Sequence, residues 1–534
     1  MERNPVSIIV PTHNRSASLK RLLDALCGQS YPLRQLEVVV VADGCTDETL
    51  RMLRGYAPPF ALTVIEQPAR GPAAARNRGA EAARGELLLF IDDDVEPLPG
   101  WAEAHRRAHA GGAERVVIGP YPLAERTPMD FLAIAQRAWW DARFYCMRQL
   151  GHRFSFADML GGNFSIEREL FFRAGGFNPD FHCHEDYELG VRLIRAGAQF
   201  VFAPEALAYH HQQDSLRSLF ARKYQEGRAD VQLARAHPEI SAALPLALAD
   251  SAPTPFIRFL RALAFAAPDM GDNVARICAR LLWPLERARL RESWRTLHDA
   301  VKLYWYWRGV ASEIGWSAWR ALLDRGEAGA SGPEVDIDLS EGLERAEARL
   351  DLARPAAVAI RYAGAHVGFV FPEAGAEPLR GAHLRPILLS KFAGPLLEAM
   401  ALAGALENDG GGSERGSLAR AIRVRSSWFG RVESGKVWSE QYAQWLQLEG
   451  REPQRPALFW EQQARIRQLE NQKAGLARQV NFWRGLAEER ERLIRKQQLL
   501  IQELEREKSA LDQERCHWEA IVQSDRDKAY KQSV

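Results

Sequence analysis

ELLLFIDDDVEP, residues 86–97, joins an apolar run to three consecutive aspartates, Asp92, Asp93 and Asp94. Adjacent carboxylates repel one another, so a chain that places them beside a buried strand needs either open water or a cation nearby. A solvated acidic turn and a metal site both meet that need. Side chains of an extended chain alternate between two faces, so Asp92 and Asp94 are expected to point the same way and Asp93 the other. That spacing suits a cation shared by Asp92 and Asp94.

Three earlier apolar runs resemble this one, at 6–12 (VSIIVPT), 36–44 (LEVVVVADG) and 61–67 (ALTVIEQ), and helical patterns fit between them. Unbroken Val, Ile and Leu runs indicate strands buried on both faces, and strand–helix repetition indicates a mainly parallel α/β sheet. Ligands of such sheets bind beyond the carboxyl ends of the strands. PTHNR (11–15), ADGCTD (42–47) and the three aspartates are therefore expected at one binding edge.

Composition limits the classes of partner. The 534 residues suffice for several domains, since single cores stop growing beyond roughly 250–300 residues. Lys and Arg number 70 against 69 Asp and Glu, so no net field favours nucleic acid. The six cysteines lack C-x-x-C spacing, and neither a signal-peptide pattern nor an apolar run of about 18 residues is found. We expect a cytoplasmic protein.

Two further folded segments are expected after the first domain. Residues 253–325 are helical, basic and aromatic; we favour a packed helical subdomain, with peripheral contact at the inner face of the cell membrane as the alternative. Residues 333–406 predict a small α+β accessory domain, with a strand at 334–340, a hairpin within 356–375 and a helix over 386–406.

The C-terminal part predicts an extension. Residues 407–456 begin with ENDGGGSERGS, a flexible-linker composition. Residues 457–525 space apolar side chains by alternating steps of three and four, which predicts a coiled coil that binds a second copy or a partner protein. A long surface helix folded onto its own chain is the alternative.

The order of motifs adds a resemblance. PTHNR, ADGCTD, GPAAARNRGAEAARGE (71–86) and FIDDDVEPLPGW (90–101), followed by residues 161–211, together resemble the family 2 glycosyltransferases. The resemblance covers roughly residues 5–230. It implies a Rossmann-like GT-A domain over residues 1–235, a nucleotide-diphosphate sugar as donor, Mg²⁺ or Mn²⁺ as cofactor, and inverting transfer.

The resemblance assigns the donor loop to Pro11, Thr12 and Asn14, and contact with the nucleobase to Asp43. A carboxylate can accept from a ring N–H, although Asp-Gly is also a common turn pair. The family often has a second acid before this aspartate, whereas this chain has Ala42.

Arg76 and Asn77 fall on the segment that lies near the diphosphate and ribose in the family. Small residues before them permit close backbone approach, and a helix N-terminus favours phosphate. The alternative for Arg76 is an exposed charge on a helix surface.

The resemblance makes Asp92 and Asp94 the pair that binds the metal and the diphosphate. Mg²⁺ is commonly held by one or two carboxylates, waters and substrate phosphates. Asp93 either joins the donor site or braces the loop. His210 matches a histidine that joins the metal or the diphosphate in some GT-A enzymes; the alternative is a surface residue at a strand end.

HCHEDYELGVRL (182–193) predicts a helix that begins near Glu185. In the family this pair of acids supplies the catalytic base, which corresponds to Asp186, while Glu185 orients the acceptor; the two roles could be exchanged. Such a base takes the proton of the acceptor hydroxyl as its oxygen attacks the anomeric carbon. A helix-capping pair is the alternative.

The resemblance implies a metal-dependent inverting transferase that acts on a hydroxyl of a glycan or lipid-linked acceptor in surface polysaccharide assembly. The Q-x-x-R-W motif of processive members is absent from residues 212–230, which favours addition of one or few sugars. A sugar nucleotidyltransferase would need a Gly-rich loop after the first strand, where PTHNR stands. The alternative of another class is a non-catalytic scaffold organised by the coiled coil.

Overall fold

The computed structural model describes residues 6–112, 114–124, 130–211, 215–247, 254–327 and 334–403. All of them belong to one compact unit, Met1–Gly430. The predicted linker, 407–456, and the predicted coiled coil, 457–525, lie outside the described residues, so both stay predictions.

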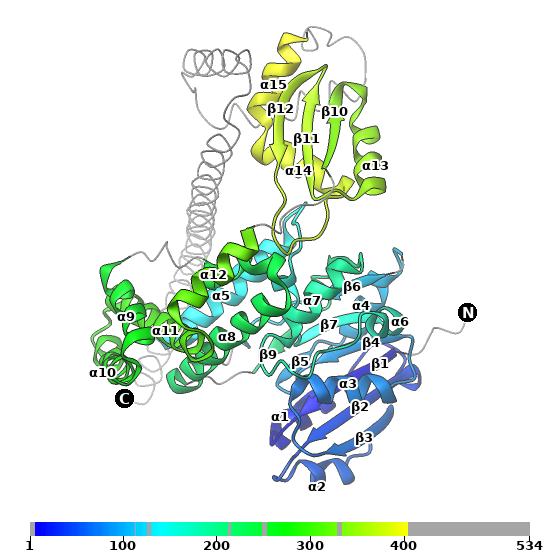
Figure 1. Ribbon diagram of the computed structural model, residues 1–534. Helices are drawn as coiled ribbons and strands as arrows, with labels where there is room; N and C mark the ends of the chain where they lie inside the picture. The colour runs from blue at the N-terminus through cyan, green and yellow to red at the C-terminus, as the bar shows by residue number, and fades with distance from the viewer. Residues whose placement is uncertain are drawn as a thin grey trace, which may run out of the picture. The chain divides into compact units, whose positions relative to one another are not determined.

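A seven-stranded sheet forms the centre of the N-terminal domain (Figure 1), in the order β3-β2-β1-β4-β7-β6-β8. Only β7 runs antiparallel to its neighbours among these strands. The predicted mainly parallel α/β sheet is confirmed. The strands are β1 Val6–Thr12, β2 Leu36–Asp43, β3 Ala61–Gln67, β4 Leu87–Ile91, β6 Arg115–Ile118, β7 Asn163–Glu167 and β8 Gln199–Phe202, with β5 Val95–Pro97 and β9 Ala208–His210 as a separate antiparallel pair.

Helices cover this sheet. The apolar side chains of β1, β2 and β4 are buried on both faces, as the unbroken runs predict, and α3 packs on β1 and β2. Because β1, β2 and β4 run parallel, their carboxyl ends open at one edge, where all three polar segments follow. The helices of this part are α1 Ser16–Cys27, α2 Thr49–Arg54, α3 Pro72–Ala82, α4 Trp101–His109, α6 Arg168–Arg173 and α7 Glu185–Arg195.

The strand β4 is shorter than expected. It ends at Ile91, and the backbone N–H of Val95 donates to the carbonyl of Asp92 at 3.0 Å, which closes a turn over the aspartates. The predicted alternation of the three side chains therefore does not apply, because it requires extended backbone.

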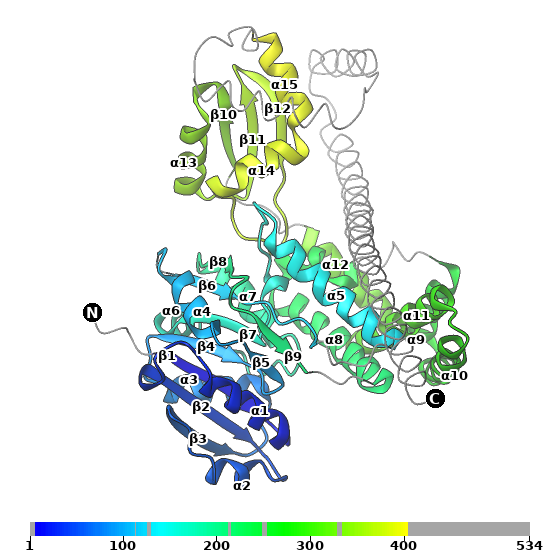
Figure 2. The ribbon, with the colours of Figure 1, turned by 180° about the vertical axis from the view of Figure 1, so that it is seen from behind.

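A second hydrophobic core lies among helices, and Figures 1 and 2 show the arrangement of these helices. Large aromatic side chains fill it, among them Trp294, Tyr304, Trp307 and Trp319, together with Val191 of α7. Residues 254–327 are thus a packed helical group. Within the described part of the chain, no helix is both long and apolar enough to span a membrane. The helices are α5 Phe131–Arg148, α8 Leu216–Ala236, α9 Pro255–Ala266, α10 Pro268–Arg287, α11 Arg291–Glu313 and α12 Trp316–Glu327.

Two glycines set the spacing of α8 and α11. A Cβ on Gly227 would strike the carbonyl oxygen of Tyr306, and a Cβ on Gly309 would strike that of Tyr224. The two helices therefore cross backbone against backbone.

The predicted small α+β part is also present. The hairpin of β11 and β12 is confirmed, and β10 pairs parallel with β11. The helix expected over 386–406 is divided at Phe392, because Pro395 lacks the N–H that a helix continuing from Lys391 would need. The elements are β10 Glu334–Asp338, α13 Leu343–Ala353, β11 Ala357–Tyr362, β12 Ala365–Val370, α14 Gly381–Lys391 and α15 Ala393–Leu402.

Candidate active site

Arg76 of α3 joins the two acidic segments that the sequence singled out. Its guanidinium lies 2.6 Å from Oδ1 of Asp92 and 2.8 Å from Oε1 of Glu185. The Arg76 side chain is 6% exposed, whereas Asp92 is 32% exposed. A buried guanidinium with two carboxylate partners cannot be a surface charge, so that alternative for Arg76 is wrong.

Asp93 and Asp94 share a second arginine. One nitrogen of Arg15 lies 3.0 Å from Oδ1 of Asp93 and 2.7 Å from Oδ2 of Asp94. The hydroxyl of Thr12 donates to Oδ2 of Asp93 at 2.7 Å. Burial raises the pKa of Asp93 to about 6 despite these donors. Asp93 thus ties β1 to the acidic turn, as expected of a residue that braces the loop.

Asp94 also meets His210 of β9. Nε2 of His210 lies 3.3 Å from Oδ1 of Asp94. Burial acts to raise the pKa of Asp94, but the hydrogen bond and charge of His210 and the charge of Arg15 outweigh it, and the pKa falls to about 2. The buried Nδ1 of His210 has no hydrogen-bond partner among the described residues. His210 is 8% exposed, so it is not the surface residue of the alternative, and its contact with a metal or a diphosphate stays a prediction.

Asp186 lies in the first turn of α7, which begins at Glu185 as predicted. Its Oδ2 accepts from the backbone N–H of Gly161 at 2.9 Å. Burial, and then the neighbouring charge of Glu185, raise the pKa of Asp186 to about 6. A carboxylate whose pKa lies close to neutral pH is suited to take a proton.

Asp43 accepts three hydrogen bonds from its own chain. Gln67 Nε2 and the backbone N–H of Arg70 donate to Oδ1 at 2.7 and 2.8 Å, and the N–H of Gly71 donates to Oδ2 at 2.8 Å. These bonds fix the turn that leads into α3. Contact of Asp43 with a nucleobase stays a prediction.

The remaining donor residues also have partners within the chain. Oδ1 of Asn14 accepts from the N–H groups of Thr46 and Asp47, and the Asn77 amide makes two hydrogen bonds to the backbone of Phe177. Asn14 and Asn77 therefore shape the loops around the site, and Pro11 lies at the end of β1. Their contacts with a donor stay predictions.

Sequence reasoning missed Arg15 and Tyr121. Arg15 lies within PTHNR, and a positively charged residue directly after the first strand could have been recognised as a partner of the aspartates. Tyr121 follows β6; its ring would meet a Cβ on Gly162 at 2.9 Å, and its centroid lies 5.7 Å from that of His210. No sequence pattern marks Tyr121, because its neighbours are distant along the chain.

The described residues of the site could supply some, but not all, of the ligands that a divalent cation needs. No group of three or more His, Cys, Asp or Glu is arranged to hold a metal ion within the described ranges. Two adjacent ligands of an octahedral ion at about 2.1 Å lie about 3 Å apart, close to the 3.3 Å between His210 Nε2 and Asp94 Oδ1. Asp94 and His210 could supply two ligands, and the others would come from phosphate and water.

Comparisons with known proteins show what the chain is similar to. The family described as Glycosyl transferase family 2 matches residues 7–172. The chain is 27% identical over 305 residues to a pre-mycofactocin glycosyltransferase of Mycobacterium tuberculosis, covering 54% of this chain and 58% of the relative. It is 33% identical over 227 residues to a validoxylamine A glucosyltransferase of Streptomyces hygroscopicus subsp. jinggangensis, covering 38% and 54%. A mannosyltransferase from Pyrobaculum calidifontis, solved with GDP-Man and Mn²⁺, is 20% identical, with coverage of 57% and 86% and a TM-score of 0.36.

The matched region contains β1, Arg76 and the acidic turn. Residues 7–172 match the glycosyltransferase family 2 model, and the mainly parallel sheet is the one that the sequence predicts. The chain spans little more than half the length of these two relatives.

Proposed function

We propose that the chain is an inverting glycosyltransferase that moves a sugar from a nucleotide-diphosphate donor to an acceptor hydroxyl. The observation that carries the proposal is Arg76, which holds Asp92 at 2.6 Å and Glu185 at 2.8 Å. Asp92 in the acidic turn after β4 is 16 residues from Arg76, and Glu185 at the start of α7 is 109 residues from it, yet both contact Arg76 in one site.

Asp186 is the proposed base. As the acceptor oxygen forms its bond to the anomeric carbon, Asp186 takes the hydroxyl proton, and the bond from that carbon to the diphosphate oxygen breaks on the opposite side. The nucleoside diphosphate leaves with the electron pair of that bond. Glu185, held by Arg76, is placed to orient the acceptor.

A divalent cation, Mg²⁺ or Mn²⁺, is proposed at Asp94 and His210, with Asp92, which Arg76 holds, as a further ligand on the side of the donor diphosphate. When bound, the cation offsets the negative charge that develops on the leaving diphosphate. Asp94 is suited to this position because its carboxylate faces Nε2 of His210 at 3.3 Å. His210 offers an uncharged nitrogen when it is not protonated.

The acceptor is proposed to be a hydroxyl of a glycan or a lipid-linked sugar in surface polysaccharide assembly, with addition of one or few residues. The names of two relatives, a pre-mycofactocin glycosyltransferase and a validoxylamine A glucosyltransferase, support an acceptor other than a polysaccharide as the second candidate. A cytoplasmic location and self-association through residues 457–525 remain part of the proposal.

The test is a panel of nucleotide sugars with the full chain. With Mn²⁺ present, one donor should raise the melting temperature, because a ligand that binds only the native state stabilises it. The same donor should then be hydrolysed or transferred, and EDTA should abolish turnover. Metal-independent turnover that survives Asp94→Ala would refute the metal mechanism. No turnover with any donor would favour the non-catalytic scaffold.

A further inference from the structure

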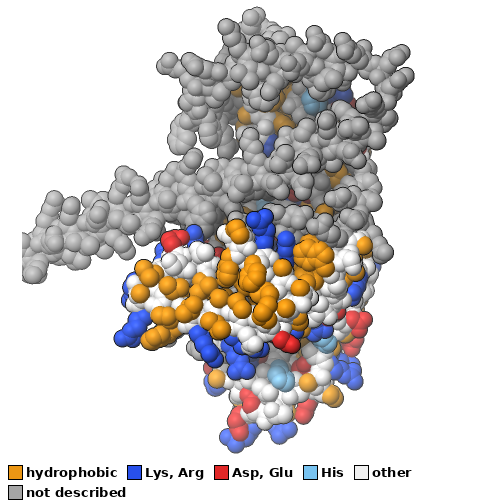
Figure 3. Space-filling view, turned by 60° about the vertical axis from the view of Figure 1, so that its left-hand side comes forward, with side chains coloured by type: hydrophobic (Ala, Val, Ile, Leu, Met, Phe, Trp, Pro, Cys, Tyr) orange, Lys and Arg blue, Asp and Glu red, His pale blue; other side chains and the backbone are white. Residues whose placement is uncertain are grey.

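The helices α9 and α10 expose an unusual amount of apolar surface. Seven large side chains on them and just beyond are 42–67% exposed: Phe256, Phe259, Met270, Ile277, Leu281, Trp283 and Leu290. Figure 3 views the molecule from this side and shows hydrophobic side chains gathered over it, with Lys and Arg at the margins. Exposed apolar residues are common singly, but a contiguous group marks an interaction surface.

The exposed group follows helix geometry. Met270, Ile277 and Leu281 are separated by seven and four residues, which places them in one row along α10. The other side of α10 packs into the helical core through Ala275 and Leu282, both fully buried. The helix therefore has one apolar face that the core uses and a second apolar face that the described chain leaves exposed.

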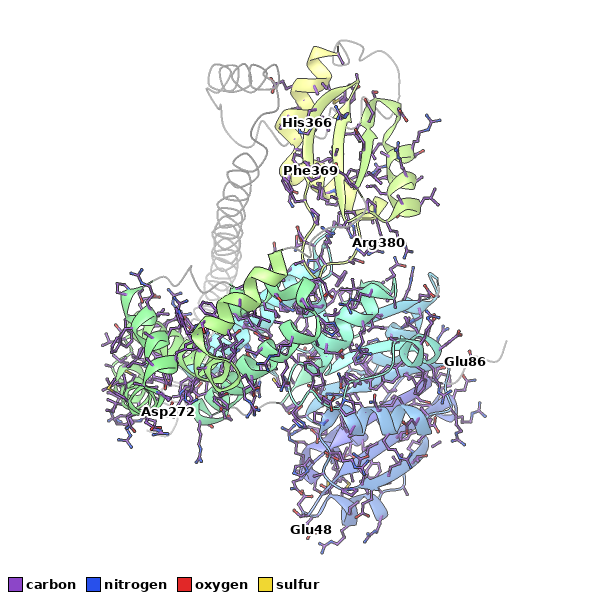
Figure 4. The ribbon with its side chains drawn as sticks, viewed as in Figure 1. Glu48, Glu86, Asp272, His366, Phe369 and Arg380 are labelled. Carbon is purple, nitrogen blue, oxygen red and sulfur yellow. The ribbon has the colours of Figure 1, made fainter. Side chains whose placement is uncertain are left out.

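Two of the three acidic side chains of α10 contact the rest of the protein, and the third, Asp269, is exposed in the first turn of the helix. Asp272, labelled in Figure 4, accepts from the hydroxyl of Tyr304 at 2.6 Å and lies 3.3 Å from Nε of Arg308. Glu286 accepts from the backbone N–H of Phe131 at 2.8 Å. These contacts fix α10 against the neighbouring helices, so the orientation of its outer face is defined.

Arginines border the exposed row. Arg276, Arg280 and Arg287 are spaced by four and seven residues, so they form a second row along α10, and all three are exposed. The guanidinium of Arg287 lies 5.6 Å from the centroid of the exposed Trp283 ring. Arg258 is exposed on α9, between Phe256 and Phe259. Apolar and aromatic side chains beside a row of arginines are typical of helices that lie in a membrane interface.

We propose that this surface, named the α9–α10 face, binds an anionic lipid bilayer. The rings and alkyl chains would enter the boundary between headgroups and acyl chains, and the arginines would contact the lipid phosphates. The arginines beside the apolar row favour an anionic bilayer over a neutral one, because only a negatively charged surface attracts them. The proposal does not depend on transferase activity, because binding is measured without donor or acceptor.

The experiment is co-sedimentation of the full chain with vesicles. The wild type should bind vesicles of phosphatidylglycerol and phosphatidylcholine, bind pure phosphatidylcholine at least about tenfold more weakly, and lose affinity as salt is added. Ile277→Ser combined with Leu281→Ser should weaken binding about tenfold or more. Arg276→Gln combined with Arg280→Gln should weaken binding to the anionic vesicles by more than about tenfold, at about fivefold per arginine.

The matched controls replace exposed leucines elsewhere. Leu150 and Leu352 are 91% and 89% exposed, so Leu150→Ser and Leu352→Ser remove similar apolar area without touching the α9–α10 face, and binding should persist. An unchanged melting temperature shows that each variant is folded. Absence of binding by the wild type would overturn the proposal. Equal binding by the Ile277/Leu281 variant would also overturn it. A third contrary outcome is a wild type that does not bind vesicles together with a variant of lower molecular mass by light scattering, which would assign the face to protein contact.

Discussion

Nδ1 of His184 lies 2.9 Å from Oδ1 of Asp230, and this contact ties the start of α7 to α8. His184 adopts a left-handed backbone, with φ of 58°, directly before Glu185 and Asp186. The second oxygen of Asp230 accepts from the hydroxyl of Tyr306 at 2.6 Å. A fully buried carboxylate thus holds in place the turn from which the proposed base projects. Nothing in the sequence of α8 marks Asp230, because its partners are 46 and 76 residues away.

Asp230→Asn should destabilise the protein by about 2–3 kcal/mol, since it removes the charge partner of a buried histidine. Because the turn before Asp186 is then less constrained, kcat should fall more than KM rises. Urea unfolding and steady-state kinetics measure the two effects. Tyr306→Phe is the control: it removes one hydrogen bond to the same carboxylate and should cost about 1 kcal/mol with little change in kcat. Equal effects of the two variants would contradict the positioning role of Asp230.

The pH dependence of kcat/KM should report the proton on Asp186. Burial and the charge of Glu185 raise its pKa from 3.8 to about 6, so activity should rise with pH through about 6, where the base loses its proton. The effect of pH on stability has the opposite sign, because the folded state binds the Asp186 proton more tightly than the unfolded state does. The contribution of Asp186 to the free energy of unfolding is fully present below its unfolded pKa, near 4, and is lost as pH rises through about 6.

Glu185→Gln removes the neighbouring charge and should move the acid limb of that profile to lower pH. Asp93 also has a pKa of about 6, so Asp93→Asn is the control, and it should leave the limb in place. A limb that follows Asp93 rather than Glu185 would exclude Asp186 as the group that titrates.

Arg76→Lys should lower kcat/KM by about 100-fold or more, because an ammonium cannot hold two carboxylates in the way that a planar guanidinium does. Stability should fall by about 2–3 kcal/mol, less than for a fully buried pair because Asp92 is 32% exposed. Arg78 is exposed on the same helix, so Arg78→Ala should change neither kcat/KM nor stability measurably. Activity near the wild-type level in Arg76→Lys would argue against the bridge.

Gly227→Ala should destabilise the protein by about 1–3 kcal/mol, because its Cβ would strike the carbonyl oxygen of Tyr306 where α8 and α11 cross. Gly315→Ala is the matched control, since a Cβ there meets nothing within 4 Å. Thermal unfolding of the two variants gives the comparison. Equal melting temperatures of the two variants would mean that α8 and α11 can move apart to accommodate a methyl group without loss of stability.

The strands could be predicted because their apolar runs are local signals. The run from Leu36 to Val41 is buried on both faces, and a sequence without polar alternation predicts that condition directly. The acidic turn was located for the same reason, since it directly follows such a run.

Burial of a charged residue could not be predicted in the same way. From the sequence, an exposed charge is an open alternative to a ligand role for Arg76, because its partner Glu185 is 109 residues away. The alternation expected for Asp92 to Asp94 failed because the strand stops at Ile91, and nothing local shows where extended backbone ends. Positions of strand ends and long-range ion pairs depend on tertiary contacts, which no short stretch encodes.

The partners of the acidic turn have a consequence for folding. Asp93 and Asp94 meet Arg15 and Thr12 across 78 to 81 residues, and Asp94 meets His210, which the ribosome adds far later. Contacts between such distant segments form slowly, because long loops must close first. A nascent chain released before β9 would carry three aspartates without their full set of partners. The turn therefore has its full set of partners only once β9 has joined the domain, and donor binding would report that completion.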